Sequence, residues 1–563
     1  MSLIPGEKLH YAETHFKFKL PWSLLYRPWP EILVDAPFQF VPSAEPTLWI
    51  VVRDAHRFPT LIESISIDID EAGDSSSATP EQSQKIDLQI KATEQFAFYP
   101  VKLGALKPGR YEVRCKLTAR RLDAESGNIT DNVRTFNRWN YPGLRPAPLK
   151  IHVLAENPPK APGYAAGEMH CHTHYSADHV EHGATPEVLQ QAAKAVGLDF
   201  TCCTDHAYDF AYTTEDYTRE ADSPLPRFQD LRDEIRQLNS NSDMPFLVAG
   251  EEVSAGNSKG ENVHMTVLGP ANYLPGLGDC GRNWLENRPT FRIAKLLEMT
   301  AAHCFAAHPM QPMGILEKFI FRRGYWNHKD LNLDASHKIR GIQFWNGIRD
   351  EGFMLGRLWW IEELGKGNFL LPIGGNDAHG DLNDTTAVST PLFSLRHTRE
   401  HVFGKVRTVV KLDEGGRLPL ASAACASSAA PSSGDTPQLP DASERDSFSL
   451  DTLNAAFAGD NCYITDGPAL WWERSDAHGI KSIAFHARSN GDTGGAFRYI
   501  RIYGRKRLSN GKLSREEDVR IESMVAAPAN TDITVPLDNY AYLRAECETA
   551  SGRFALTSAA RAE

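Results

Sequence analysis

The sequence predicts an α/β protein in which a central region of β/α units, arranged around a parallel sheet or barrel, lies between two β-sandwiches. The chain has 563 residues. Single hydrophobic cores stop growing near about 250 to 300 residues, so two to four domains are expected. Short β-rich runs dominate both ends of the chain, whereas strands alternate with helical segments in the middle. A hydrophobic content of 41% supplies enough apolar material for several packed cores.

The N-terminal β-sandwich is expected over residues 1–156. The runs that predict its strands are PTLWIVV, ESISIDID, KIDLQIKA, GRYEVRCKL and PLKIHVL, and Gly, Pro, Asp and Ser separate them. Residues 157–166 are rich in Pro, Gly and Ala, which is typical of a linker.

The β/α region is expected over residues 167–415, where TPEVLQQAAKAVG, RFQDLRDEIRQLN and TFRIAKLLEMTAAH read as helices between apolar strands. Residues 416–447 are of low complexity, with too little apolar content to offset the entropy of ordering, which predicts a mobile loop. A C-terminal β-sandwich is expected over residues 448–563, from runs such as KSIAFHARS and FRYIRIYGRK.

The net charge indicates which class of partner to expect, and the cysteines indicate whether disulfides form. The formal net charge of -12 argues against a surface that follows a phosphate backbone, so no nucleic acid polymer is expected as a partner. Nine scattered cysteines, two of them adjacent at Cys202 and Cys203, suit buried free thiols better than a disulfide framework. The first twenty residues lack the apolar core of a signal peptide, and no run is long enough to span a membrane, which predicts a cytoplasmic protein. The oligomeric state cannot be read from the sequence.

The strongest local motif is GEMHCHTHYSADH at residues 167–179, at the end of a short strand. Side chains alternate along a strand, so His170 and His172 point to the same face and can reach one ion. With 20 histidines in the chain, chance alone gives about 0.7 such pairs. The motif therefore decides little by itself.

Further ligand-type residues follow at the ends of successive predicted strands. These are His206 after DFTCCTD, Glu252 after FLVAGE, His264 within NVHMTVLG, His308 after FAA, and Asp377 with His379 after FLLPIGGN. In β/α barrels the C-terminal strand ends converge on one mouth, where active sites assemble. The pattern predicts that these residues share one site on one face of the domain.

These residues resemble the ligand pattern of the polymerase and histidinol phosphatase (PHP) superfamily, over roughly residues 165–385. The resemblance implies a distorted (β/α)7 barrel and nine metal ligands: His170, His172, Asp178, His206, Glu252, His264, His308, Asp377 and His379. It implies that His170, His172, Glu252 and Asp377 hold one ion, that Glu252, His264 and His308 hold a second, and that Asp178, His206 and His379 hold a third. Glu252, Asp377 and His308 are the residues expected to act in catalysis.

The donor types are consistent with that resemblance. Imidazole and carboxylate without thiolate suit two or three divalent ions of zinc, manganese or iron. A bridging Glu252 would place two ions about 3.5 to 4 Å apart, a separation at which they can share a hydroxide nucleophile. The neighbouring Glu251 is interpreted as a solvated or salt-bridged residue, because the resembling pattern is Gly-x-Glu.

Several other residues near the predicted site remain open between a functional and a structural role. Unassigned histidines are more often surface or supporting groups than catalytic acids; here they are His174, His179, His182 and His303. Five residues are candidates for substrate binding, although solvated arginines and a packed aromatic are equally consistent with the sequence; they are Arg322, Arg323, Arg349, Trp345 and Asn346.

Three functions are compatible with these observations. The first is hydrolysis of a small-molecule phosphoester by a metal-bridging hydroxide. The second is hydrolysis of a carboxyl ester or carbamate at the same centre, because NCYITDGPALWW and the β flanks look like the carbaryl-hydrolase-like branch of the superfamily. The third is a non-catalytic scaffold in which the β-domains bind a partner and the barrel is a relic. A module that serves a DNA polymerase is disfavoured by the acidic charge.

Overall fold

The structure is a computed structural model, which describes residues in several segments of the chain. These are 29–72, 82–140, 146–176, 183–211, 225–279, 287–331, 339–380, 382–383, 385–389, 394–398, 400–412, 448–477, 480–506, 518–537 and 539–562. The predicted loop at 416–447 and the predicted ligand Asp178 lie outside the described residues.

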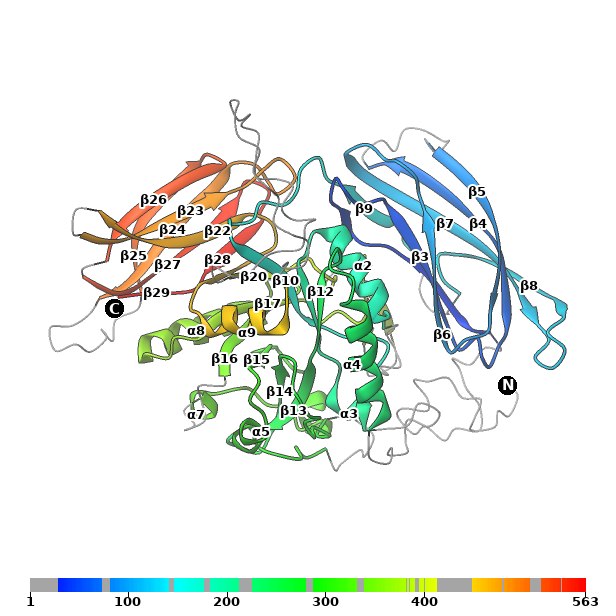
Figure 1. The fold of residues 1–563 in the computed structure, drawn as a ribbon, viewed down its shortest axis with the longest axis horizontal. Helices are drawn as coiled ribbons and strands as arrows, with labels where there is room; N and C mark the ends of the chain where they lie inside the picture. Colours follow the sequence, from blue (N-terminus) through cyan, green and yellow to red (C-terminus); the bar gives the residue numbers. More distant parts are fainter. Residues whose placement is uncertain are drawn as a thin grey trace, which may run out of the picture.

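The N-terminal sandwich consists of two sheets around one core (Figure 1). One sheet has the order β1-β3-β6, and the other has the order β2-β9-β7-β4-β5 with β8 paired to β7. The strands are β1 Glu31–Asp35, β2 Gln39–Phe40, β3 Thr47–Arg53, β4 Thr60–Glu71, β5 Gln82–Ala92, β6 Phe96–Lys102, β7 Gly109–Leu122, β8 Ile129–Asn137 and β9 Leu149–Val153. Burial alternates along β7, because every second side chain faces the partner sheet. Its inward residues, such as Val113 and Leu117, share a core with Ile50 and Val52 of β3.

The largest sheet runs from the central region into the C-terminal region. Its order is β12-β11-β10-β20-β21-β28-β27-β24-β25, with β29 paired to β27. The strands are β10 Tyr164–Cys171, β11 Phe200–Cys203, β12 Phe246–Ala249, β20 Arg407–Lys411, β21 Cys462–Thr465, β24 Phe497–Lys506, β25 Val519–Ala527, β27 Tyr540–Thr549, β28 Phe554–Thr557 and β29 Ala560–Arg561. The sheet therefore crosses the boundary that the sequence predicts between the β/α region and the last domain.

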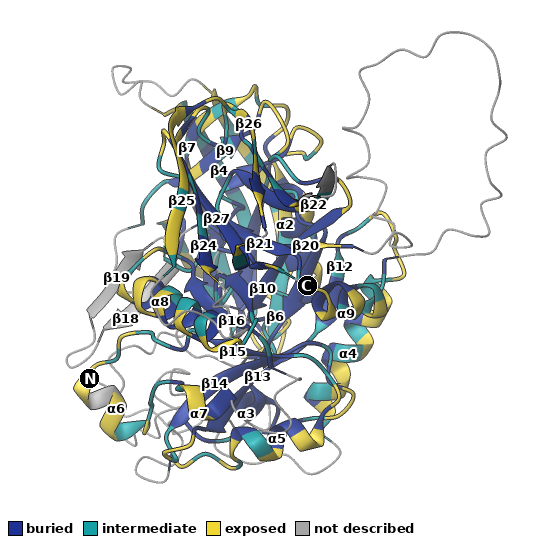
Figure 2. Ribbon diagram, turned by 90° about the vertical axis from the view of Figure 1, so that its left-hand side faces the viewer, coloured by how far each residue is buried: buried dark blue, intermediate teal, exposed yellow. Residues whose placement is uncertain are grey.

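A second central sheet has the order β13-β14-β15-β16-β17, and a separate hairpin pairs β18 with β19. The strands are β13 Glu251–Gly256, β14 Asn262–Val267, β15 Cys304–Ala307, β16 Ile339–Asn346, β17 Leu371–Gly375, β18 Thr385–Ser389 and β19 Ser394–Thr398. Figure 2 shows that β10, β15 and β16 are buried, while the helices carry the exposed residues around them.

Helices cover the central sheets. They are α2 Pro186–Val196, α3 Ala207–Phe210, α4 Pro226–Leu238, α5 Ile293–Met299, α6 Ile315–Ile320, α7 His328–Leu331, α8 Glu351–Lys366 and α9 Leu450–Ala458. Capping residues set the limits of α8. The Asp350 side chain accepts a hydrogen bond from the Phe353 amide at the start of α8, and Gly367 ends that helix with a φ of 93°.

The predicted barrel of seven β/α units is wrong. By residue the structure is 46% strand and 16% helix. β13 pairs antiparallel with β14, β14 with β15, and β10 with β20, so the described strands do not form a ring of parallel units. Only residues 257–261 join β13 to β14, and a parallel pair needs a crossover of about a dozen residues or more. The short connection makes these two strands a hairpin.

The C-terminal region is again a two-sheet sandwich, and it lies at the left of Figure 1 while the N-terminal sandwich lies at the right. A three-stranded sheet, β22-β23-β26, packs on the end of the large sheet. Its strands are β22 Ala469–Ala477, β23 Ile480–Arg488 and β26 Asn530–Pro536. Leu470 and Phe485 from this sheet share a core with Ile502 and Leu543 from the large sheet.

Candidate metal centre

The predicted ligands lie where the two central sheets meet. His170 is in β10, Glu252 in β13 and His264 in β14, whereas His206, His308, Asp377 and His379 follow the ends of their strands. Two isolated bridges join the sheets at this point, Cys171 with Ala378 and His206 with Glu252. Both bridges involve a ligand-type residue or its immediate neighbour. The line between the sheets, instead of a barrel mouth, brings the candidate ligands together.

The eight described members of the predicted set fall into three groups whose donor atoms lie within 4.8 Å of one another. These groups are His170, His172, Glu252 and Asp377; Glu252, His264 and His308; and His172, His206 and His379. The first two match the sequence-based assignment. In the third, His172 stands beside His206 and His379.

Glu252 is the hub of the centre. Its Oε1 lies 2.8 Å from His264 Nδ1 and 3.0 Å from His308 Nε2. Its Oε2 lies 2.8 Å from His206 Nδ1. A single buried carboxylate therefore faces imidazoles from three different chain segments, which is the arrangement expected of a bridging ligand.

Two pairs of imidazole nitrogens face each other directly. His170 Nε2 and His172 Nε2 are 3.2 Å apart, and His206 Nε2 and His379 Nε2 are 3.5 Å apart. Two nitrogens bound to one tetrahedral zinc ion at its usual bond length would be about 3.3 Å apart. The spacing is therefore compatible with a shared cation, as it is with an N–H···N hydrogen bond.

Orphaned polar atoms support the same conclusion. His206 Nδ1, His264 Nδ1 and Glu252 Oε2 are buried, and none has a hydrogen-bond partner with acceptable geometry among the described residues. They lie close to oppositely charged atoms, but their directions do not form hydrogen bonds. Buried polar atoms that lack a partner are costly unless something else satisfies them, and a divalent ion would do so.

The electrostatics of the cluster favour bound positive charge. Burial alone would raise the pKa of Glu252, but His264 and His170 outweigh it and hold that pKa well below its usual range. Burial would lower the pKa of His264, but Glu252 and Asp279 raise it to about 10. His170 behaves similarly, with a pKa of about 9. Burial and then His379 and His206 push the pKa of His172 well below its normal value, so that ring stays neutral and able to ligate.

Residues that sequence reasoning missed hold the ligands in place. Asp279 Oδ2 lies 2.8 Å from His264 Nε2 and leaves the other ring nitrogen for the centre. Gln343 Oε1 lies 2.8 Å from His170 Nδ1, and Ser176 Oγ lies 3.1 Å from His172 Nδ1. Such partners fix the tautomer and orientation of a metal-binding histidine. Nothing in their spacing marks them in the sequence.

Glu251 differs from the sequence-based interpretation. It is fully buried, not solvated, and its Oε2 accepts a hydrogen bond from the Leu274 amide. Burial raises the pKa of this carboxyl well above its usual value. The choice of Glu252 as the candidate ligand agrees with its place in the cluster.

Two of the candidate ligands have a strained backbone. His308 and Asp377 have φ values of 27° and 53°, in a region that residues other than glycine rarely adopt. Each such conformation costs on the order of 1 to 3 kcal/mol and persists only where its surroundings enforce it. Gly375 is required for packing here, since a Cβ there would lie 2.9 Å from the His170 Cβ.

A cavity of about 150 Å³ opens onto the cluster, and His264, His308 and Asp377 line it. Of the five candidate substrate residues, Asn346 and Arg323 also line it. Asn346 Nδ2 donates to Asp377 Oδ2 over 3.1 Å, and Arg323 Nε donates to Asp279 Oδ2 over 2.6 Å.

The other three candidates do not line this cavity. Arg322 is exposed, and Arg349 pairs with Glu548 of the C-terminal sandwich. Trp345 is 1% exposed because its ring packs against Phe353 and Phe554 in the core. The cavity instead contains a residue that sequence reasoning did not select, His401. Its Nδ1 lies 2.8 Å from the Asn376 carbonyl oxygen.

The described cysteines are free and buried, as the sequence predicts; they are Cys115, Cys171, Cys202, Cys203, Cys304, Cys462 and Cys547. Among the placed residues, no helix is long and apolar enough to cross a membrane.

Comparisons with known proteins assign no family. No protein-family model matches the chain, and no curated protein matches it. Among solved structures, a β-D-mannosidase from Dictyoglomus thermophilum is 10% identical with a TM-score of 0.21, covering 94% of this chain and 66% of that one. A Bacteroides uniformis β-glucuronidase is 10% identical with a TM-score of 0.17, covering 94% of this chain and 60% of that one. At these TM-scores the likeness supports no conclusion about fold or activity.

Proposed function

We propose that this chain is a metal-dependent hydrolase that cleaves small-molecule phosphoesters. The observation that carries the proposal is the convergence of His170, His172, His206, His264, His308 and His379 on two carboxylates, Glu252 and Asp377. Facing nitrogens and orphaned buried atoms accompany that convergence. The resemblance to the PHP superfamily is in keeping with it.

Two or three divalent ions held by these residues would acidify a shared water and stabilise charge that develops on the phosphoryl oxygens. The protein's own groups would orient the substrate. Arg323 lines the cavity beside His264 and His308, where a guanidinium suits a phosphoryl group. Asp279 fixes the Nε end of that guanidinium. This arginine favours a phosphoester over a neutral ester.

His401 is the candidate general acid. Its Nδ1 bonds to a backbone carbonyl, so Nε2 is the nitrogen that can exchange a proton with a bound substrate. Delivery of that proton to the leaving oxygen would complete the hydrolysis. Asn346 donates to Asp377, and both residues line the cavity.

The proposal is tested by an activity screen on protein stripped with a chelator and reloaded with zinc, manganese or iron. p-Nitrophenyl phosphate and bis-p-nitrophenyl phosphate are compared with p-nitrophenyl acetate and an aryl N-methylcarbamate. Metal-dependent turnover of a phosphate ester is expected. Turnover of only the acetate or carbamate would favour the carboxyl-ester alternative, and absence of both metal binding and turnover would favour the scaffold.

Arg323→Ala adds a sharper test, with the exposed neighbour Arg322→Ala as its matched control. The Arg323 variant is expected to raise KM for phosphate esters by about tenfold, which corresponds to one charge-assisted contact of about 1.4 kcal/mol. The control should leave KM unchanged. Equal effects in both variants would remove the argument for an anionic substrate.

A further inference from the structure

The segment that carries His379 leads directly to the N-terminal sandwich. Leu382 and Asn383 follow His379 by three and four residues, and both are buried. The Leu382 amide donates to Asp35 Oδ2 over 2.9 Å. Asp35 is 2% exposed and lies near Arg138 of the same sandwich, with Arg138 Nη2 3.4 Å from Asp35 Oδ1. The chain just beyond this candidate ligand is therefore anchored to a different part of the molecule.

Asn383 makes the more specific contact. Its Oδ1 accepts from the Lys150 amide over 3.0 Å, and its Nδ2 donates to the Lys150 carbonyl over 2.9 Å. Lys150 is in β9, which pairs with β7 on one side but with β2 only at His152 and Val153 on the other. The amide of Asn383 thus takes the place of a strand peptide beside Lys150, and it extends the sheet of the N-terminal sandwich.

A second segment of the same histidine group also touches the sandwich. His174 lies two residues after His172, and its ring centroid is 5.3 Å from that of Phe96 in β6. His172 and His379 stack with ring centroids 4.0 Å apart. Two of the three segments that supply His172, His206 and His379 are therefore in contact with the N-terminal sandwich.

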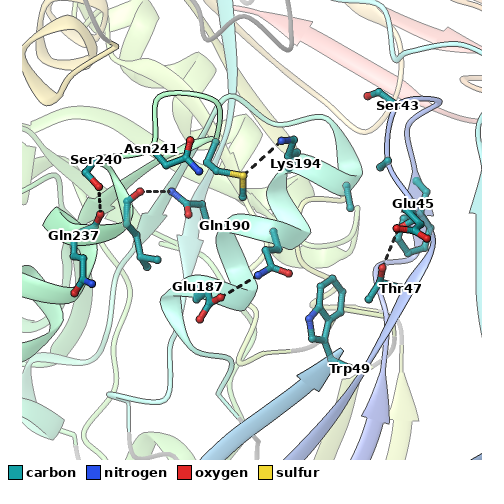
Figure 3. A pocket seen from close by; sticks show the side chains of 16 residues that line it. Ser43, Glu45, Thr47, Trp49, Glu187, Gln190, Lys194, Gln237, Ser240 and Asn241 are labelled. Atoms are coloured by element: carbon teal, nitrogen blue, oxygen red, sulfur yellow. Dashed lines mark hydrogen bonds between the residues drawn. The ribbon is translucent and has the colours of Figure 1, made fainter. Parts of the chain in front are cut away.

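The sandwich is itself fixed to the central region by backbone contacts. The Val41 amide donates to the Ala195 carbonyl over 2.8 Å, and Gln39 Nε2 donates to the Val196 carbonyl over 3.1 Å. Figure 3 shows the rim of this interface, where a groove of about 600 Å³ separates Trp49 of β3 from Glu187 and Lys194 of α2. These bonds hold β2 against the end of α2, so the sandwich that carries Asp35 and Lys150 is attached to the central region at a second place.

We propose that the N-terminal sandwich is a positioning element of the metal centre, and that it sets His379 through Asn383 and Asp35. This inference rests on the proposed metal-dependent function. His379 Nδ1 lies 3.2 Å from the Asp377 carbonyl of its own loop, so the position of the loop sets the position of the ring. By contrast, His170 and His264 are oriented by Gln343 and Asp279 of the central region. The ion at His172, His206 and His379 should therefore depend on the sandwich, and the other ions should not.

The chain supplies a matched control for Asn383. Asn140 makes the same pair of bonds, since its Oδ1 accepts from the Ile32 amide over 2.9 Å and its Nδ2 donates to the Pro30 carbonyl over 2.7 Å. Both of its partners lie inside the N-terminal sandwich. Asn383→Ala and Asn140→Ala thus remove equal hydrogen bonds, but only the first removes a link to the metal centre.

The experiment measures ions bound per chain, and the affinity of each ion, in full-length wild type, Asn383→Ala, Asn140→Ala and His379→Ala at buffered free zinc. Asn383→Ala is expected to weaken one ion by about tenfold to a hundredfold, the range seen when supports of metal ligands are lost. Asn383→Ala should weaken the same ion that His379→Ala loses. Asn140→Ala should bind every ion with wild-type affinity. Asn383→Asp, which keeps the volume and one of the two bonds, serves if the alanine variant fails to fold.

If Asn383→Ala and Asn383→Asp bound every ion with the affinity of the wild type, the positioning role would be overturned. The proposed metal centre would not be affected by that result. Equal weakening of every ion in both the Asn383 and Asn140 variants would also overturn it, because that result would reflect general destabilisation. If wild type itself bound no zinc, the proposed function would fail before the variants were compared.

Discussion

The candidate metal centre and the arginine cluster of the C-terminal sandwich are both buried and both charged, but their charges are balanced in different ways. Arg544, 1% exposed, donates through Nε to Asp518 Oδ2 over 2.7 Å and through Nη1 to Glu546 Oε1 over 2.5 Å. Arg505 and Arg357 complete the set through Asp518 and Glu546 respectively. Each carboxylate there faces guanidinium donors with good geometry.

The metal centre is paired only in part. Its imidazole nitrogens face one another, and Glu252 Oε2 and His264 Nδ1 have no hydrogen-bond partner among the described residues. The arginine cluster is complete as protein alone, which suits a structural role. The histidine cluster leaves buried imidazole and carboxylate atoms without hydrogen bonds, which a bound cation would satisfy. Burial of charge therefore does not distinguish the two sites, whereas the satisfaction of each polar atom does.

The largest expected effect is from Glu252→Gln, which removes the hub carboxylate. Loss of several kcal/mol of transition-state stabilisation corresponds to a fall in turnover of about a thousandfold, with loss of bound metal. Steady-state kinetics and elemental analysis measure both. Glu251→Gln is the control, because that buried carboxyl bonds to the Leu274 amide and should retain metal. Similar metal loss in both variants would undermine the assignment of Glu252.

Arg544→Ala is expected to lower the free energy of unfolding by about 3 to 5 kcal/mol without reducing the number of bound ions. The cause is the pair of buried carboxylates left without their partner. Urea unfolding measures this effect. Arg498→Ala removes an ion pair whose arginine side chain is 70% exposed, so it should cost less than about 1 kcal/mol. If Arg544→Ala were as mild as Arg498→Ala, the C-terminal cluster would not be structural.

His401→Gln is expected to reduce kcat by about a hundredfold, or about 2.7 kcal/mol, with metal content unchanged. The loss should shrink for substrates with better leaving groups, since these need less proton transfer. His303→Gln is a suitable control, because His303 Nε2 contacts the Asn454 carbonyl and does not line the cavity. A wild-type kcat for His401→Gln on a poor leaving group would exclude His401 as the acid.

The smallest effect concerns acid stability. Burial would raise the pKa of Asp518, but Arg544 and the Tyr542 hydroxyl outweigh it and lower that pKa. The stabilisation that ionised Asp518 gives the folded state is fully present above the pKa of an aspartate in the unfolded chain, about 3.9. It is lost as the pH falls through the lower pKa of Asp518 in the folded state. Thermal unfolding between about pH 5 and pH 2 should therefore show a steeper loss of stability for wild type than for Asp518→Asn. Parallel curves would contradict this linkage.

The predicted fold is wrong, whereas the assignment of the ligand-type residues stays a prediction whose members the structure brings together. Ligand-type residues at the ends of predicted strands can be identified directly from the sequence. The structure brings eight of the nine predicted ligands together. The direction of a strand, and the strand with which it pairs, cannot be identified from the sequence, because an apolar run is compatible with either a parallel or an antiparallel sheet. The run FLVAGEEVSAG was interpreted as ending one strand at Glu252. The structure divides it at Gly250 into β12 of the large sheet and β13 of the other sheet.

Other parts of the site depend on distant contacts that no local pattern encodes. The positive φ values of His308 and Asp377 are imposed by their surroundings. Asp279 reaches His264 from a loop, and Asn383 reaches β9 from a segment 233 residues away in sequence. Composition likewise could not separate Arg323, which lines the cavity, from its exposed neighbour Arg322.

The most direct test of the central claim is the metal content of the purified, dialysed protein by elemental analysis, for wild type and Glu252→Gln in parallel. Two or three equivalents of zinc, manganese or iron per wild-type chain are predicted, with loss of the ions that Glu252 bridges in the variant. A wild-type protein that binds no divalent ion after supplementation would contradict the account, because the facing imidazoles would then be satisfied by protons alone.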